Sequence, residues 1–212
     1  MRHYVDLHLR PQTIEAAVEM ERLAASLGYA HVASIKPAGG AATRIDVEAK
    51  HSKELQDALR RNRRRCDILA VRCLSKEVAR QAAKDDRIDI IQFPDDPIQR
   101  KQNHLDTHEA ELLDGSGRAY EVNVCDFLAS SPMHLSKAIN LIKKDLAVAT
   151  RRDIPLILSS GASAPLAMRE PRALTALASL LDIDEEYAAD MLSTVPQEIL
   201  ERNHARLHEE EP

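Results

Sequence analysis

The chain has no tryptophan, and only two phenylalanines and four tyrosines occur among its 212 residues. Its apolar content comes mainly from Ala, Leu, Ile and Val, so we expect an aliphatic core. No apolar run approaches the roughly 18 residues that a membrane-spanning helix needs, which excludes a spanning segment. The start, MRHYVDLHL, lacks the apolar stretch of a signal peptide, and we therefore expect a cytoplasmic protein with no membrane partner.

Cysteine is also scarce, and the three present are Cys66, Cys73 and Cys125. Their number is odd and each falls in an apolar, strand-like segment, which indicates free thiols in a reducing compartment. None belongs to a CxxC pair, so the spacing gives no support to a zinc site. We expect buried thiols without a metal or a disulfide.

A surplus of positive charge is missing as well. The chain has 29 Lys and Arg against 34 Asp and Glu, a net charge of −5, which argues against a wholly basic nucleic-acid-coating protein. A local basic patch remains open, and the run RRNRRR offers one through Arg60, Arg61, Arg63, Arg64 and Arg65. On a helix these arginines would spread around most of the circumference, so part of the run is a solvated face. Such a cluster in an otherwise acidic chain is also a footprint for phosphates.

Seven short runs rich in Val and Ile alternate with helical patterns. They cover residues 4–9, 30–35, 44–49, 67–73, 88–93, 119–124 and 154–159. Several are too continuously apolar to have a solvated face, which is typical of parallel strands covered by helices. Either an open doubly wound sheet or a closed barrel would fit this alternation. A dinucleotide-binding open sheet would show a glycine-rich first turn, and LRPQT after the first strand has no glycine, so we favour a TIM-like α/β barrel.

From about Pro171 onward the pattern is purely helical, which predicts extra C-terminal helices packed on the barrel. An α/β barrel of about this length is commonly one domain. We therefore predict a single domain over residues 1–212.

Acidic residues and a histidine mark the ends of two predicted strands. Asp6 and His8 project to the same side of the first strand and could begin a metal site. Arg10 occupies the position of an expected third ligand, and a fixed cation raises the cost of binding a divalent ion. A hydrogen-bonded pair at the barrel mouth is the other interpretation. Asp95 and Asp96 suit either catalytic carboxylates or a turn, and that choice stays open.

Three basic residues stand at or near the ends of other strands, namely Lys36, Arg72 and Arg169. All three would emerge where the carboxyl ends of the strands meet, which is where binding sites of barrels gather. A cation that is partly buried there needs either an internal carboxylate or an external phosphate. Both interpretations remain open at this stage.

The stretch LILSSGASAPLAMREP, residues 156–171, ends an apolar run in five small residues. Ser159 and Ser160 begin this small-residue segment, which could cradle a phosphate, hold a metal or turn a corner. A nucleophilic serine is disfavoured because the GxSxG pattern is missing and no sequence pattern identifies a histidine that would activate a serine. The small residues would let an RNA or a protein surface approach the backbone.

Six segments of the sequence together resemble those of a known protein family. They are HVASIKP, DILAVRC, IDIIQFP, AYEVNVCDFL, PLILSSGASAPLAMREPRAL and MLSTVPQEILERN. In this order, over nearly the whole chain, they resemble the p30-type protein subunit of archaeal and eukaryotic ribonuclease P, called protein component 3 in archaea. The resemblance implies an α/β barrel related to the polymerase and histidinol phosphatase superfamily, one of several small proteins that assemble on a catalytic RNA.

The resemblance also bears on the small-residue segment. Metal-dependent phosphatase relatives read DxHxH in the first strand and something like SDAH at the end of a late strand. Here Arg10 follows Asp6 and His8, and Gly161 and Ser163 stand where an Asp and a His would be. The resemblance thus implies a dismantled metal site, with no cofactor bound by this chain and with Asp6 and His8 as weak vestigial candidates.

We therefore expect a non-catalytic subunit of the complex that removes the 5′ leader from precursor tRNA. The basic residues named above, with Ser159 and Ser160, would contact RNA or a partner protein. The expected partners are the ribonuclease P RNA, precursor tRNA and the other protein subunits, especially one small partner, and Mg²⁺ is expected to serve the RNA. The alternatives are a metal-dependent phosphoesterase that uses Asp6 and His8 and a purely protein-binding module.

Overall fold

The structure of the protein, a computed structural model, describes residues 2–129 and 131–209 and contains seven parallel strands. They are β1 (Tyr4–Leu9), β2 (Tyr29–Ser34), β3 (Ala42–Ala49), β4 (Ile68–Cys73), β5 (Ile90–Gln92), β6 (Ala119–Asn123) and β7 (Leu156–Ser159). Each strand pairs with the next one along the chain, from β1 to β7. All seven predicted strands are confirmed, with ends that differ by a few residues.

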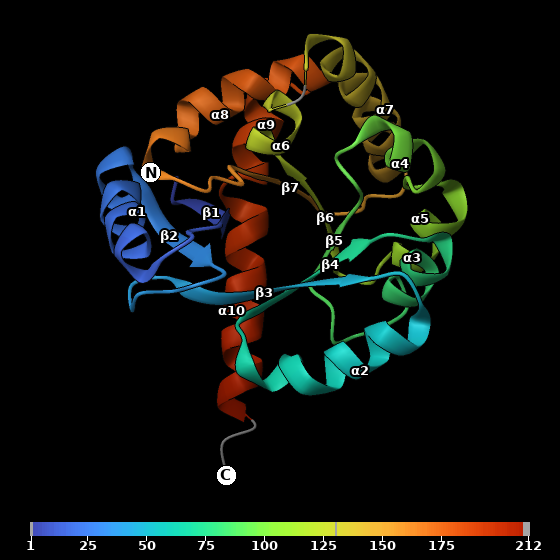
Figure 1. Cartoon of the computed structure of the whole chain (residues 1–212), viewed down its shortest axis with the longest axis horizontal. Coiled ribbons are helices and arrows are strands. Elements are labelled where there is room, and N and C mark those ends of the chain that lie inside the picture. The colour runs from blue at the N-terminus through green and yellow to red at the C-terminus, as the bar shows by residue number, and fades with distance from the viewer. Residues whose placement is uncertain (1, 130, 210–212) are drawn as a thin grey trace.

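The sheet curls until its first and last strands meet. Leu9 forms a parallel bridge with Ala162, and the Arg10 backbone N–H donates to the Ala162 carbonyl at 2.8 Å. The result is a nearly closed barrel (Figure 1), which confirms the predicted fold class. We call the end formed by the carboxyl ends of the strands the mouth, and the opposite end the amino end.

Helices alternate with the strands and ring the barrel (Figure 1). They are α1 (Ile14–Leu27), α2 (Ser52–Asn62), α3 (Lys76–Ala82), α4 (Pro97–Gln102), α5 (Thr107–Leu113), α6 (Val124–Leu128) and α7 (Pro132–Thr150), with short 3₁₀ turns η1 (Arg63–Arg65) and η2 (Pro165–Ala167). The ends of the first helix, α1, are set by residues of its own sequence. Thr13 accepts a hydrogen bond from the Ala16 N–H, and Gly28 ends the helix at a φ of 96°, which glycine tolerates.

The aliphatic core has two parts. The larger part lies between the outward faces of the strands and the surrounding helices. The smaller part fills the barrel toward the amino end and consists of Val5, Leu7, Ala33, Ile68, Ala70, Ile90, Ala119, Ile157 and Ile199. Because this inner layer is apolar and fully buried, the polar residues of the barrel interior lie between it and the mouth.

The C-terminal helices complete the barrel, as predicted. They are α8 (Pro171–Ala178), α9 (Glu185–Met191) and α10 (Thr194–Glu209), with the turn η3 (Ser179–Leu181) between the first two. The long helix α10 crosses the barrel in Figure 1. Its Ile199 is 2% exposed and joins the inner apolar layer, so α10 closes the amino end.

The three cysteines are free thiols within this core. Cys66 and Cys73 are buried and Cys125 is partly buried. Burial raises the pKa of Cys66 to about 12, which keeps its thiol protonated. The predicted free thiols are confirmed. In the part of the chain that the structure describes, no helix is both long enough and apolar enough to cross a membrane.

Candidate functional site

A buried guanidinium group occupies the barrel interior just above the apolar layer. Arg44 on β3 is 0% exposed, and its Nη1 and Nη2 donate to Glu121 of β6 at 2.9 and 2.6 Å. Its Nε donates to Asp46 at 2.8 Å, and Nη1 also donates to the Leu7 carbonyl at 2.7 Å. Two-pronged contacts of this kind are the strongest that a guanidinium makes.

The charge of Arg44 governs the carboxylates around it. Burial alone would raise the pKa of Glu121, but the Arg44 guanidinium, together with His8 and the Ser159 hydroxyl, holds that pKa below its ordinary value. Asp46 responds in the same way, and its pKa is strongly lowered despite burial. The Gln92 amide and the Ser159 hydroxyl also donate to Glu121. The carboxylate is thereby ionised and fully engaged.

His8 extends this network toward the mouth. Its Nε2 lies 2.8 Å from Asp46 Oδ2, and its Nδ1 lies 2.9 Å from Asn123 Oδ1. Both ring nitrogens therefore have protein partners. The interpretation of His8 as a hydrogen-bonded residue at the barrel mouth is the one that the geometry supports.

Asp6, the other vestigial candidate, accepts hydrogen bonds from backbone N–H groups. Its Oδ1 accepts from the N–H groups of Ser160 and His8 at 3.0 and 3.2 Å. Its Oδ2 is buried and has no hydrogen-bond partner among the described residues. Burial raises the pKa of Asp6, because the charged form is poorly solvated there.

The small-residue segment faces inward. Ser159 donates to Glu121, and Ser160 accepts from the Ala162 N–H at 3.1 Å through its hydroxyl. The two serines are 0% and 1% exposed. The expectation that they offer a surface to RNA or to a partner is therefore corrected, because both hydroxyls serve the interior network.

Gly161 explains why this segment is small. Its φ of 63° lies in the left-handed region, and a Cβ there would lie 2.9 Å from both Arg10 Nη2 and Asn123 Cβ. The Arg10 Nε donates to the Gly161 carbonyl at 2.8 Å, and Arg10 also pairs with Asp126. Glycine is required so that this guanidinium can approach the backbone.

Arg72 has internal carboxylates as partners in this structure. Its Nη2 lies 2.9 Å from Asp95 and 3.7 Å from Asp126, and its Nε lies 3.6 Å from Glu48. Asp96 caps α4 by accepting from the N–H of the third residue of that helix. The pair of aspartates thus serves an ion pair and a helix start.

Lys36 and Arg169 are the exposed cations predicted for the mouth. Lys36 Nζ donates to the Gln12 carbonyl at 2.6 Å. Arg169 Nη1 donates to the carbonyls of Leu166 and Met168, both at 2.8 Å. Neither forms an ion pair within the described residues, so both stay available to an external anion.

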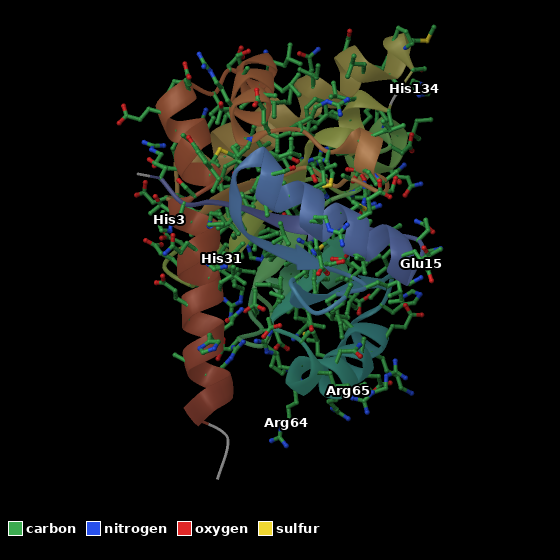
Figure 2. All side chains as sticks on the ribbon, turned by 90° about the vertical axis from the view of Figure 1, so that its left-hand side faces the viewer. His3, Glu15, His31, Arg64, Arg65 and His134 are labelled. Atoms are coloured by element: carbon green, nitrogen blue, oxygen red, sulfur yellow. The ribbon has the colours of Figure 1, made fainter. Side chains whose placement is uncertain are left out.

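The run RRNRRR lies at the other end of the barrel. It forms the end of α2 and the turn η1, directly before β4, and therefore belongs to the amino end. Figure 2 shows Arg64 and Arg65 projecting outward from the lower end of the molecule. Arg63 instead turns inward and pairs with Asp89 at 2.6 Å. The basic residues predicted as one set are thus divided between two ends.

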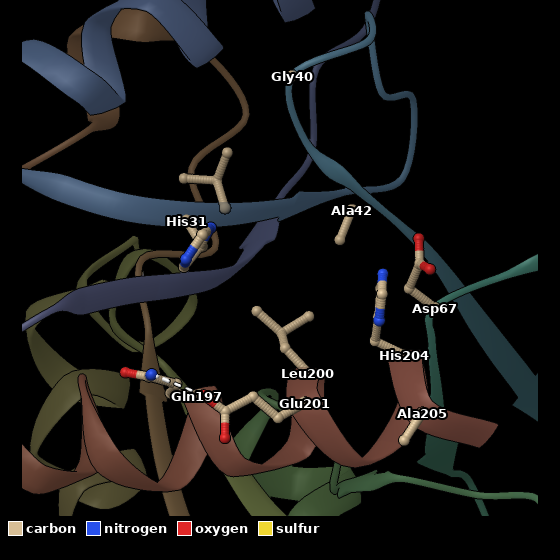
Figure 3. A pocket seen from close by; sticks show the side chains of 10 residues that line it. His31, Gly40, Ala42, Asp67, Gln197, Leu200, Glu201, His204 and Ala205 are labelled. Carbon is tan, nitrogen blue, oxygen red and sulfur yellow. Dashed lines mark hydrogen bonds between the residues drawn. The ribbon is translucent and has the colours of Figure 1, made fainter. Parts of the chain in front are cut away.

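A pocket between the β2–β3 junction and α10 is a separate hollow of about 520 Å³. Figure 3 shows Leu200 at its floor and the side chains of Asp67, Glu201 and His204 around it. Gln197 and Glu201 are joined by a hydrogen bond of 2.8 Å. Asp67 and Glu201 line this pocket and no arginine or lysine is among its described lining residues, so it is unsuited to an anion such as phosphate.

The mouth does not fit a divalent ion. Within residues 2–129 and 131–206, no group of three or more His, Cys, Asp or Glu side chains is placed to hold a metal. The donors of Asp46, Glu121 and His8 are engaged by Arg44 and by amide groups. A metal would have to displace a buried cation to reach them.

The residues at the centre of this network were not predicted from the sequence. They are Arg44, Asp46, Gln92, Glu121 and Asn123. A signal was present, because Arg44 and Asp46 sit two residues apart within one strand run, and Glu121 and Asn123 do so in another. Charged or polar residues at a spacing of two in an apolar strand share one face, which here is the barrel interior.

The geometry defines a class of protein: a TIM-like α/β barrel whose mouth is closed by guanidinium–carboxylate pairs and whose exposed cations lie at both ends. The comparison with protein families is consistent with this class. The family model described as RNase P subunit p30 matches residues 40–208, about four fifths of the chain. The chain belongs to this family, as the resemblance indicated.

Individual relatives agree with that assignment. Ribonuclease P protein component 3 of Methanosarcina mazei is 27% identical over 212 aligned residues, which cover 93% of this chain and 87% of the relative. The protein of the same name from Methanococcoides burtonii is 24% identical, with 95% and 88% covered. Among solved structures, a chain in a cryo-EM structure of archaeal Ribonuclease P with mature tRNA has a TM-score of 0.80 at 18% identity, with 95% and 91% covered, and shows the same fold.

Proposed function

We propose that this chain is a protein subunit of ribonuclease P that does not itself cleave RNA. Family membership supports the first half of the proposal. The observation that carries the second half is Arg44, whose buried guanidinium neutralises the carboxylates that a metal-dependent hydrolase would need free.

The work of such a subunit is to support a catalytic RNA by contact. The exposed cations at the two ends of the barrel are suited to phosphate groups, which release counterions when they are neutralised. The partners would be the ribonuclease P RNA, precursor tRNA and the other protein subunits, with one small subunit bound directly. Magnesium ions would be held by the RNA, since the donors at the mouth are already engaged.

The alternative function is a metal-dependent phosphoesterase. The contacts of its two candidate metal ligands, Asp6 and His8, do not support it. Asp6 accepts hydrogen bonds from backbone N–H groups, and His8 is held between Asp46 and Asn123. Hydrolysis of this type needs a metal with an open coordination position for water. Among the residues that the structure describes, the mouth does not offer three free ligands.

Reconstitution tests the proposal directly. The catalytic RNA and the remaining protein subunits are assembled with and without this chain, and cleavage of precursor tRNA is followed over a range of Mg²⁺ concentrations. Addition of the chain should raise the rate or lower the Mg²⁺ concentration required. Identical Mg²⁺ profiles with and without the chain would count against a role in the complex.

A further inference from the structure

A cavity of about 480 Å³ lies at the amino end of the barrel, outside the mouth and the network described above. Its walls come from the end of α2, the turn η1, the segment that precedes β5, and α10. We call it the arginine pocket, and it is lined by Leu59, Arg60, Arg63, Arg64, Asp86, Arg87 and Arg206. Five of the seven lining residues are thus arginines, in a chain whose net charge is −5.

The buried carboxylate of Asp89 holds several of the arginines at this end of the barrel without matching their charge. Buried Asp89 lies 2.6 Å from Arg63 Nη1 and 3.6 Å from the Nη2 atoms of both Arg202 and Arg206. One carboxylate therefore serves three guanidinium groups. Positive charge is therefore in excess around Asp89, and the partly exposed Arg202 and Arg206 face solvent with part of theirs.

Arg63 has a donor that no protein atom uses. Its Nη1 is taken by Asp89 and by the Arg87 carbonyl at 3.4 Å. Its Nη2 is buried and has no hydrogen-bond partner among the described residues. An unpaired buried charged donor is costly, and a small movement of the Arg63 side chain would present it to an anion in the pocket that this residue lines.

The rim supplies further donors in fixed positions. Arg87 is held by Asp85, to which its Nε and Nη2 donate at 2.8 and 2.7 Å. Arg64 is exposed and has no ion pair within the described residues, and the nearest carboxylate of Arg60 is that of Asp57 at 4.0 Å. Pre-oriented and free guanidinium groups are thus combined in one concave site.

We infer that the arginine pocket binds the phosphate backbone of RNA at the end of the barrel opposite the mouth. The described lining contains five arginines and no lysine, and its one carboxylate, Asp86, pairs with Arg118 at 2.6 Å. Guanidinium groups match phosphate oxygens with two parallel hydrogen bonds. The inference rests on the proposed function, because ribonuclease P RNA and precursor tRNA are the RNAs that the chain would meet.

An acidic protein segment has matching charge but fits the pocket less well. Protein interfaces centre on apolar or aromatic anchors that fill desolvated pockets. Here the one apolar lining residue, Leu59, is fully buried and offers no such contact. An RNA backbone needs charge and hydrogen-bond donors alone.

Part of the run also stabilises its own helix. Arg60 and Arg61 lie in the last turn of α2, where cations interact favourably with the helix dipole. That effect falls off within the last turn. It does not account for Arg63 and Arg64 beyond the helix or for Arg87 from another segment.

The test compares two double variants of the full chain. Arg60→Ala with Arg64→Ala removes two exposed arginines of the pocket, so the fold should be retained, and circular dichroism checks this. Arg22→Ala with Arg172→Ala is the matched control, since it removes two exposed arginines on α1 and α8. The affinity of each protein for ribonuclease P RNA is measured over a range of KCl concentrations.

The pocket variant should bind the RNA about tenfold more weakly at low salt, and the slope of log affinity against log salt should become shallower by roughly 1 to 2. The control should match the wild type. Replacement of the same two arginines by lysine should preserve the slope but lower the affinity. The charge is kept, but the planar guanidinium that forms two parallel hydrogen bonds is lost. A pocket variant that matches the control would overturn the inference, and so would loss of binding to another protein subunit with RNA affinity intact.

Reconstituted precursor-tRNA processing separates this inference from the proposed function. If the wild-type chain changes processing and the pocket variant does so equally well at all salt concentrations, the pocket inference fails alone. If the wild-type chain has no effect on processing, the proposed function fails, and the RNA affinities still decide whether the pocket binds phosphates.

Discussion

Arg44 is the residue on which the chemistry of the barrel depends. It sits among Glu121, Asp46 and the Leu7 carbonyl, where its fixed charge keeps two carboxylates ionised. A divalent ion would also keep such carboxylates ionised, but it would leave coordination positions for water. The guanidinium provides the charge without the reactive water, which is suited to a structural role.

Arg44→Met should lower the free energy of unfolding by about 3–5 kcal/mol, because it leaves two carboxylates without their buried cation. Urea denaturation at neutral pH measures this change. Arg172→Met, at an exposed position on α8, is the matched control and should change stability by less than about 0.5 kcal/mol. A loss below about 1 kcal/mol for Arg44→Met would show that the network does not depend on its cation.

Asp6→Asn should change the pH dependence of stability. Burial raises the folded-state pKa of Asp6 above its ordinary value of 3.8, so folded protein holds a proton that unfolded protein has released. The contribution of Asp6 to stability is therefore full below pH 3.8 and is lost as the pH rises through the folded-state pKa. Asparagine cannot titrate, and the stability of Asp6→Asn relative to wild type should increase from about pH 4 toward neutrality.

The measurement is the free energy of unfolding of both proteins at several pH values between 4 and about 7. A difference in unfolding free energy that is the same at every pH reflects only the different hydrogen bonds of the asparagine amide. If the difference stays constant or shrinks as the pH rises, Asp6 is not a carboxyl with a raised pKa.

At the residue scale, the sequence predicted which polar residues lie near the mouth better than it predicted which residues they contact. Asp6, His8 and Arg10 were recognised as polar groups near the mouth, and the metal interpretation was disfavoured because of Arg10. Arg44 and Glu121 were missed because their partners come from strands that are 77 residues apart in the chain. Such pairing depends on how the barrel closes, which local periodicity does not report.

At the scale of elements, α10 and the inner apolar layer hold the amino end of the barrel. Ile199 enters the same buried cluster as Val5 and Ile157, which come from the first and last strands. The β1–β7 seam has few backbone contacts, since it relies on a single bridge and the Arg10 N–H. Side-chain packing by α10 therefore contributes to closure of the barrel.

Ile199→Ala should cost about 2–5 kcal/mol of unfolding free energy, because it removes buried methyl groups and leaves a cavity inside the barrel. Thermal or urea unfolding would report the loss. Leu180→Ala is the control, since Leu180 is 41% exposed and should be far more tolerant. Equal losses for the two variants would indicate that α10 does not seal the inner layer.

Element existence was well predicted because it depends on local signals. The seven strand runs all appear where the sequence placed them, with ends that differ by a few residues. The strand IDIIQF was predicted over residues 88–93, but the paired segment is Ile90–Gln92. Strand length depends on the register of the neighbouring strands, which the sequence of one segment does not contain.

At the scale of the whole molecule, the two ends of the barrel have different characters. The mouth is closed by internal ion pairs around Arg10, Arg44 and Arg72, and exposed cations such as Lys36 stand at its rim. The amino end carries the arginine pocket. The prediction grouped these cations by charge alone, although the run RRNRRR directly precedes the predicted strand over residues 67–73 and therefore belongs to the end opposite the mouth.

The most direct measurement of the central claim uses the purified chain alone. Precursor tRNA and a simple phosphoester are incubated with it in the presence and absence of Mn²⁺ or Mg²⁺, and turnover is compared with that of Asp6→Ala. The account predicts no metal-dependent turnover above the background rate for either protein, since Arg44 and the hydrogen bonds of His8 leave no site for the ion. Turnover by the wild-type chain that a chelator abolishes and that Asp6→Ala loses would contradict the account.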